Sequence, residues 1–298
     1  MKFNHIMCKR LVGVLLCLLT LTPIVSAQHR WALVIGISHY QDGSGWPDIH
    51  GTNDADLIAD RLKGFDLTVL KNEEANRNNI VAGLNHICAN AYRGDVVYIH
   101  FSGHGQPFED TNNDEADGWD ESFVPYDALL AYREDEYTGE NHLTDDYFER
   151  VFDEIRNKLG PEGFLFAVFD ACHSGTMGRD NDIFSNEDYL PTRGTYIGFS
   201  KEKIYHPKRS ESINAIAIDH NQKLSDIIVL EACKADQTNK EIIVDDVFYG
   251  PLSYSIATVI DNMGLIGNAQ WSHSVRKEME HLISDNRRQE LVIESSVQ

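Results

Sequence analysis

From residue 30 onward, apolar runs alternate with amphipathic stretches along the chain. The apolar runs are nearly continuous, which is typical of strands in a parallel sheet that is covered on both faces. Such strands are predicted over 31–37, 67–70, 95–101, 164–169 and 226–230. The amphipathic stretches predict helices over 53–63, 78–91, 144–159, 253–262 and 273–285. The pattern therefore predicts an α/β fold with a mostly parallel central sheet and helices on both faces.

Two longer stretches, 106–143 and 176–222, are polar and irregular. We expect them to be loops, since their composition gives them little to bury. Asn53 and Thr144 are expected to cap the helices that begin there. In parallel sheets functional residues gather at the carboxyl ends of the strands, so these loops are expected to surround a site at that edge.

The first 27 residues have the pattern of a secretory signal. Three basic residues precede a short apolar run at 11–21, and small residues lead to a cleavage position at Ala27. The run is shorter than the ~20 residues that a membrane span needs. We therefore expect export to a periplasm or to the outside, and one mature domain over 28–298 without stable membrane insertion.

Charge narrows the choice of partners. The chain carries a formal net charge of −21, and loss of residues 1–27 would make it more acidic still. Such a surface repels nucleic acid and anionic membranes, and it favours cations such as Ca²⁺ and basic peptides. We expect a monomer with no organic cofactor and no nucleic-acid partner.

Two short segments that directly follow predicted strands carry reactive side chains. The segment 102–105 holds His104 between two glycines, and the segment 170–175 holds Cys172. A thiolate is the nucleophile that a cysteine peptidase needs, and a nearby imidazole can generate and hold it. A backbone N–H from the nucleophile and one beside the base could then form an oxyanion hole. His173 is expected to point away, since adjacent side chains in extended backbone face opposite sides.

The mature chain keeps three cysteines, so at most one disulfide could form. Cys88 lies in a predicted helix and is expected to be a small buried hydrophobe. Cys233 follows the predicted strand 226–230. Cys172 is the cysteine whose surroundings point to chemistry.

The acidic residues suggest two further uses. Asp170 lies two residues before Cys172, on the same side of an extended chain. A carboxylate there opposes thiolate formation, so binding a positively charged substrate side chain is the better use for it. A second acidic group at 110–121 is followed by Asp145 and Asp146. It fits either a solvated acidic loop or a site for a hard cation, although its spacing is not that of an EF-hand.

The segments around His104 and Cys172 resemble the two signature blocks of the metacaspases, caspase-like cysteine peptidases of clan CD. Further similarity lies at 32–36, 51–55, 117–127, 144–146 and 233–237. The resemblance covers most of residues 30–260 in the family's order, and with the predicted signal it suggests a bacterial secreted type. It departs from true caspases, whose nucleophile follows Gln-Ala. The resemblance implies a caspase-hemoglobinase fold.

The resemblance also implies roles for single residues. Cys172 would be the nucleophile and His104 the general base and acid, with the backbone N–H groups of Gly105 and Cys172 as oxyanion donors. Polypeptide substrates would be cleaved after Arg or Lys. The pocket for that basic side chain would be formed by Asp54, Ser102 and Asp170. For Asp54, a helix cap is the alternative role.

A regulatory Ca²⁺ site is implied at Asp120, Asp145 and Asp146. Asp180 would be a fourth ligand, although the local spacing there is shifted by one residue. Basic residues after the nucleophile suggest a further hypothesis, calcium-triggered self-cleavage within 193–209. The candidate positions in this stretch are Lys201, Lys203, Lys208 and Arg209.

Two other functions compete with this interpretation. One is a legumain-, gingipain- or clostripain-like peptidase, which would share the His and Cys but differ in its specificity pocket. The other is a non-catalytic caspase-like module, which the presence of both His104 and Cys172 disfavours.

Overall fold

The computed structural model describes residues 28–112, 115, 117–173, 190–204, 206, 216, 218–235, 237–283 and 289–297. The predicted signal segment lies outside these residues, as do Asp180, Lys208 and Arg209. Within the described ranges we find no helix whose length and apolar character would suit a membrane span.

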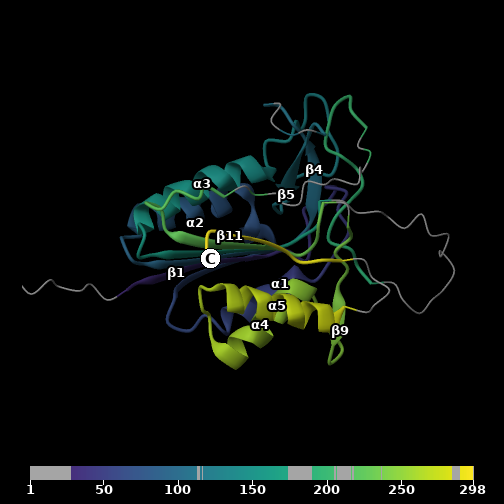
Figure 1. Cartoon of the computed structure of the whole chain (residues 1–298). Helices are drawn as coiled ribbons and strands as arrows, with labels where there is room; N and C mark the ends of the chain where they lie inside the picture. Colours follow the sequence, from purple (N-terminus) through teal and green to yellow (C-terminus); the bar gives the residue numbers. More distant parts are fainter. Residues whose placement is uncertain are drawn as a thin grey trace, which may run out of the picture.

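A six-stranded sheet forms the centre of the structure (Figure 1). Its strands, in spatial order, are β11 (Val292–Ser295), β8 (Asp226–Glu231), β7 (Phe164–Asp170), β3 (Val96–Ser102), β1 (Arg30–Gly36) and β2 (Asp66–Lys71). Neighbouring strands are parallel except β11, which pairs antiparallel with β8. The predicted mostly parallel sheet is confirmed.

Helices cover both faces of this sheet, also as predicted (Figure 1). One face carries α2 (Arg77–Asn90) and α3 (Asp145–Leu159), and the other carries α1 (Gly51–Ala59), α4 (Pro251–Met263) and α5 (Ala269–Leu282). A short 3₁₀ helix, η1 (Asn72–Ala75), follows β2. Because side chains alternate along a strand, β1 supplies Leu33 and Ile35 to one hydrophobic core and Ala32 and Val34 to the other.

The predicted cap at Asn53 is wrong. The helix begins at Gly51 with His50 as its N-cap residue, and no side chain caps it. Gly51 packs so closely on the end of β3 that an added Cβ would be 2.5 Å from the Ser102 carbonyl oxygen. Asn53 instead donates its side-chain N–H to the Phe248 carbonyl at 3.0 Å. Thr144 is the N-cap residue of α3, although its side chain makes no capping hydrogen bond.

The prediction of an irregular loop over 106–143 is also wrong in part. This stretch contributes to a three-stranded sheet of β4 (Gly105–Glu109), β5 (Trp119–Phe123) and β6 (Leu143–Thr144). A hairpin of β9 (Ile242–Val244) and β10 (Val247–Tyr249) was not predicted either. Figure 1 shows β4, β5 and β9 at the same end of the central sheet.

A buried polar network holds β4 in place. The Gln106 side-chain amide donates to the carbonyls of Leu130 and Ile197, both at 2.8 Å. Its oxygen accepts from His142 Nε2 at 2.8 Å, and His142 Nδ1 lies 2.9 Å from the Tyr137 hydroxyl. These polar side chains can be buried because each one has a hydrogen-bond partner. The polar composition of the stretch suggested a loop because the sequence does not show these partners.

We predict a pH-dependent contribution of His142 to stability. Burial lowers the pKa of His142 from 6.5 to about 3, so unfolding at low pH lets it bind a proton that the folded protein excludes. Between neutral pH and pH ~4 this costs the wild type about 3 kcal/mol of unfolding free energy, which His142→Gln does not lose. Urea titrations across this range should show the gap between the two proteins narrowing. Equal gaps at both pH values, or the same narrowing for the exposed control His273→Gln, would contradict the prediction.

Candidate active site

Two adjacent strands bring the predicted catalytic residues to one edge of the sheet. In the parallel register of β3 and β7, Ser102 pairs with Asp170. His104 and Cys172 each follow two residues later, so the topology places their backbones side by side at the carboxyl ends of these strands. This is the edge at which parallel α/β sheets gather functional groups.

One nitrogen of the His104 imidazole makes a hydrogen bond, and the other has no partner among the described residues. Nε2 lies 3.0 Å from the Pro47 carbonyl oxygen, which can only accept, so Nε2 carries the proton. Nδ1 is buried and has no hydrogen-bond partner among the described residues. The ring stacks on Trp46 at 4.9 Å, and burial lowers its pKa to about 4. His104 is therefore a neutral imidazole whose free nitrogen can accept a proton.

The thiol of Cys172 is buried and turned toward a backbone carbonyl. Its Sγ lies 2.8 Å from the Gln237 carbonyl oxygen, to which it donates. The thiol of Cys233 faces the same carbonyl, with its Sγ 3.7 Å from the Gln237 oxygen. A hydrogen bond with Cys172, together with burial, raises the pKa of Cys233 well above its ordinary value. In this arrangement the thiol is turned to the Gln237 carbonyl, and contact with any group on another side of Cys172 requires rotation about its side-chain bond.

The backbone N–H groups of Gly105 and Cys172 converge on one acceptor. They donate to the carbonyl oxygen of Arg193 at 3.1 and 3.0 Å. Gly194, the next residue, forms a parallel bridge with Gly105 and packs so closely on Cys172 that an added Cβ would clash with the Cys172 backbone. The chain's own Arg193–Gly194 peptide bond thus lies against the nucleophile, with its carbonyl held by the two predicted oxyanion donors.

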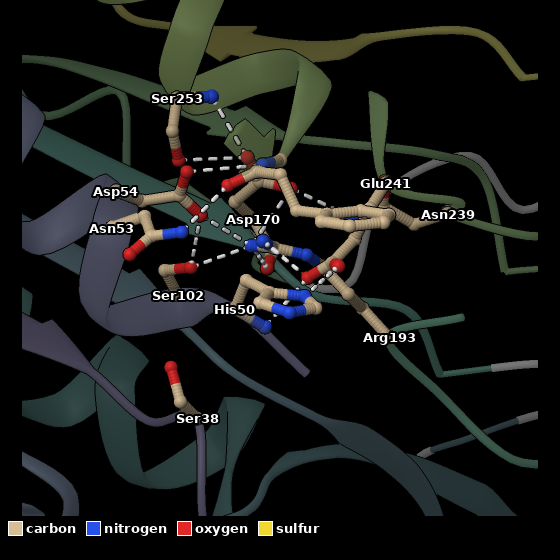
Figure 2. Close-up of polar contacts among 12 residues, drawn as sticks. Ser38, His50, Asn53, Asp54, Ser102, Asp170, Arg193, Asn239, Glu241 and Ser253 are labelled. Atoms are coloured by element: carbon tan, nitrogen blue, oxygen red, sulfur yellow. Dashed lines mark hydrogen bonds and ion pairs between the residues drawn. The ribbon is translucent and has the colours of Figure 1, made fainter. Parts of the chain in front are cut away.

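The side chain of Arg193 is fully buried in an acidic pocket (Figure 2). Nη1 donates to Asp54 Oδ2 at 2.6 Å and to Ser102 Oγ at 2.5 Å, and Nη2 donates to Glu241 Oε1 at 2.8 Å. Although burial opposes its charge, Asp54, Asp170 and Glu241 together raise the pKa of Arg193. Burial raises the pKa of Asp54 to about 7, while Arg193 favours its charged form. The pocket therefore holds a cation through two carboxylates on different segments.

Asp170 contributes to this pocket less directly than the sequence suggested. Its Oδ2 accepts from the backbone N–H and the hydroxyl of Ser253, both at 2.7 Å, and its Oδ1 accepts from Asn239 at 2.7 Å. The nearest Arg193 nitrogen, Nη1, is 3.8 Å from Oδ1. The Asp170 carboxylate thus supplies charge near the guanidinium, while Asp54, Ser102 and Glu241 accept its short hydrogen bonds.

Sequence reasoning missed Glu241, Arg193 and Gln237 as members of the site. Glu241 directly precedes β9 and lies in no predicted element, and its bond to His50 spans 191 residues. Arg193 could have been found because it is a basic residue at the start of 193–209, the stretch in which self-cleavage was expected. His173 packs against the core instead, with its ring edge-on to Phe123 at 4.8 Å and Nδ1 3.2 Å from the Ser122 carbonyl oxygen.

Three of the predicted metal ligands, Asp120, Asp145 and Asp146, lie on β5 and at the start of α3, while Asp180 is outside the described residues. Asp120 and Glu121 belong to β5, and Asp145 and Asp146 form the first residues of α3. Burial and the charges of Glu121 and Asp120 raise the pKa of Asp145 to about 10. Asp145 Oδ1 is buried with no hydrogen-bond partner in the described part of the chain. Asp146 accepts from Asn112 at 2.8 Å.

Within the residues that the structure describes, no three His, Cys, Asp or Glu side chains converge closely enough to hold a metal ion. The carboxylate oxygens nevertheless fit a hard cation by donor type. An orphaned buried oxygen on Asp145, crowded by neighbouring acids, is the feature that a bound cation would satisfy.

Comparisons with known proteins agree with this fold. A family model described as Caspase domain matches residues 29–297. Metacaspase-1A of Neurospora crassa is 25% identical over 284 residues, covering 84% of this chain and 60% of the relative. Metacaspase-1B of Aspergillus oryzae is 25% identical over 291 residues, covering 84% and 65%. The chain thus spans somewhat less than two thirds of the length of these relatives.

Solved structures show the same architecture. Protein GSU0716 from Geobacter sulfurreducens has a TM-score of 0.61 at 19% identity, covering 91% of this chain and 94% of that chain. The structure of pro-sf-caspase-1 has a TM-score of 0.52 at 13% identity, covering 91% and 88%. The resemblance inferred from the segments around His104 and Cys172 is confirmed, and the chain belongs to the caspase domain family.

Proposed function

We propose that the chain is a cysteine endopeptidase that cleaves peptide bonds after a basic residue. The observation that carries the proposal is the position of Arg193–Gly194. The Arg193 side chain fills the acidic pocket, and the Arg193 carbonyl accepts from the N–H groups of Gly105 and Cys172. Gly194 packs on Cys172. A peptide substrate would have to make these same contacts.

The reaction follows from the donors and acceptors in the site. The Cys172 side chain first rotates away from the Gln237 carbonyl. His104 Nδ1 then takes the proton from the thiol, and the thiolate attacks the carbonyl carbon. The negative charge that develops on oxygen is stabilised by the two backbone N–H groups. The C–N bond breaks as His104 returns the proton to the leaving amine, and a thioester remains. Water that loses a proton to His104 then hydrolyses the thioester and restores the thiol.

Loss of the nucleophile tests the activity. Cys172→Ala should abolish hydrolysis of peptides with Arg or Lys before the cleaved bond, by about a thousandfold or more, because no thioester can form. Cys88→Ala removes a thiol outside the site and should hydrolyse these peptides like wild type. Fluorogenic peptides with Arg, Lys, Asn or Asp measure the rates. Hydrolysis by Cys172→Ala would refute the mechanism, and a preference for Asn or Asp would favour a legumain-like specificity.

We further propose that the chain cleaves itself at Arg193–Gly194. This bond lies within the stretch expected for self-processing, but Arg193 was not among the residues singled out. Lys201 pairs with Glu134 at 2.7 Å and Lys203 with Glu109 at 3.2 Å, and both lysines are exposed. These two lysines therefore pair with acids outside the pocket. Arg193 is favoured as the cleaved residue because its side chain already occupies the pocket.

Sequencing of new amino termini tests the cleavage position. The purified protein should yield a fragment that begins at Gly194, because the Arg193 carbonyl already accepts from the N–H groups of Gly105 and Cys172. Arg193→Gln should lose that fragment, since an uncharged side chain leaves the pocket carboxylates unpaired. Lys201→Gln, which changes a nearby basic residue, should still be cleaved. Fragments that begin only after other basic residues would contradict the assignment.

We also propose that Ca²⁺ regulates the enzyme through Asp120, Asp145 and Asp146, with Asp180 as a candidate outside the described residues. A bound cation would supply positive charge between crowded carboxylates and tie β5 to the start of α3. The same strand β5 pairs with β4, where Phe123 lies opposite Gly105. Binding could therefore be transmitted to the oxyanion donor through one pair of strands.

Titration calorimetry with CaCl₂ tests the site without relying on activity. Wild type should bind Ca²⁺ and gain about 2–3 kcal/mol of stability at a hundredfold excess over Kd. Asp145→Asn should lose most of this gain, yet match the metal-free stability of wild type because burial favours the neutral acid. The exposed control Asp42→Asn should bind like wild type. Unchanged binding by Asp145→Asn would exclude this site.

A further inference from the structure

We propose that Glu241, held in position by His50, is a specificity-determining residue that makes the pocket select arginine over lysine. The proposal rests on the proposed peptidase function and refines it. The buried Arg193 guanidinium stands in for the basic side chain of a substrate.

The pocket binds the two terminal nitrogens of the guanidinium on two separate sides. Asp54 on α1 and Ser102 at the end of β3 accept from Nη1 at 2.6 and 2.5 Å. Glu241, just before β9, accepts from Nη2 at 2.8 Å. The remaining donor, Nε, has no partner among the described residues. Recognition of arginine therefore depends on the planar fork of two nitrogens.

A lysine cannot satisfy both sides. Its single ammonium nitrogen lies at the depth of the arginine Cζ atom, one bond short of the positions of Nη1 and Nη2. An ammonium drawn toward Asp54 and Ser102 leaves Glu241 without the donor that it receives from Arg193. The Glu241 side chain is fully buried, and a buried carboxylate that loses a partner is strongly unfavourable. A site that loses a buried polar contact in this way discriminates against the smaller ligand.

His50 fixes the direction in which Glu241 points (Figure 2). Its backbone N–H donates to Glu241 Oε1 at 2.8 Å, and its Nδ1 lies 2.6 Å from Oε2. Because a carboxylate oxygen accepts, Nδ1 carries a proton. The His50 ring also stacks on Phe248 at 4.4 Å with an interplanar angle of 10°. Two bonds and one stacked ring thus hold the carboxylate toward the guanidinium, which makes His50 a positioning residue.

Asp170 does not account for the same selectivity. Its Oδ2 accepts from Ser253 and its Oδ1 from Asn239, and Arg193 Nη1 is 3.8 Å from Oδ1. The bond that Nη1 donates to Asp170 is long, at 3.4 Å, and goes to the backbone carbonyl. Its charge favours any cation in the pocket, whether arginine or lysine. Glu241 differs because its hydrogen bond goes to a nitrogen that lysine lacks.

Paired peptides that differ only in Arg or Lys before the cleaved bond test the proposal. We expect wild-type protein, cleaved to completion, to prefer Arg by about a hundredfold in kcat/KM. Glu241→Gln should lower this ratio at least tenfold, through slower hydrolysis of the Arg peptide. His50→Phe, which keeps a ring to stack on Phe248, should lower it by a smaller factor. Glu74→Gln, an exposed change of the same kind, should leave the ratio unchanged. A ratio that Glu241→Gln does not change, or an equal loss for both peptides, would overturn the proposal.

A second measurement does not require catalysis. In a Cys172→Ala background, Arg193→Lys should lower the urea midpoint of unfolding, since Glu241 loses its hydrogen bond from Arg193 Nη2. In Glu241→Gln protein the same replacement should lower the midpoint less than half as much, whereas in Glu74→Gln protein the full shift should remain. Equal shifts in all backgrounds would refute the role of Glu241. If wild type cleaved neither peptide, the peptidase proposal would fail, and this cycle would still decide the role of Glu241.

Discussion

The buried ion cluster around Arg193 connects more of the molecule than any other interaction described. One guanidinium joins the first turn of α1, the end of β3 and the segment before β9 through Asp54, Ser102 and Glu241. A buried charge is tolerated only when it is paired and hydrogen-bonded. The cluster therefore requires Arg193 to be seated, and seating it brings the carbonyl of the same residue onto the N–H groups of Gly105 and Cys172.

The parts of the fold that depend on local pattern were predictable. The central strands could be found because their residues are buried on both faces and nearly all apolar, as in β7. Strand β4 could not, because Gln106 is a polar residue whose burial depends on Leu130, Ile197 and His142. The start of α1 was missed because tight packing of Gly51 on β3, not a side-chain cap, determines where the helix begins.

The site residues likewise fall into those that local sequence pattern predicts and those that depend on the fold. His104 and Cys172 could be found because each follows an apolar strand in a short segment that contains glycine. Glu241 could not, since its role depends on His50, which lies far away in the sequence and whose own neighbours suggest a helix start. The direction of the Cys172 thiol toward Gln237 likewise depends on the fold, because residue types alone do not determine a side-chain rotation. Pattern thus identifies reactive groups, and packing determines which of them meet.

The seating of Arg193 also has a kinetic meaning. A ligand that belongs to the same chain competes at a high effective concentration, because it cannot diffuse away from the pocket. A peptide present at micromolar levels would rarely displace it, however well it fits the pocket. A chain whose own Arg193 occupies the pocket is thus insulated from dilute peptides, and another peptide enters only at a concentration that matches this internal ligand.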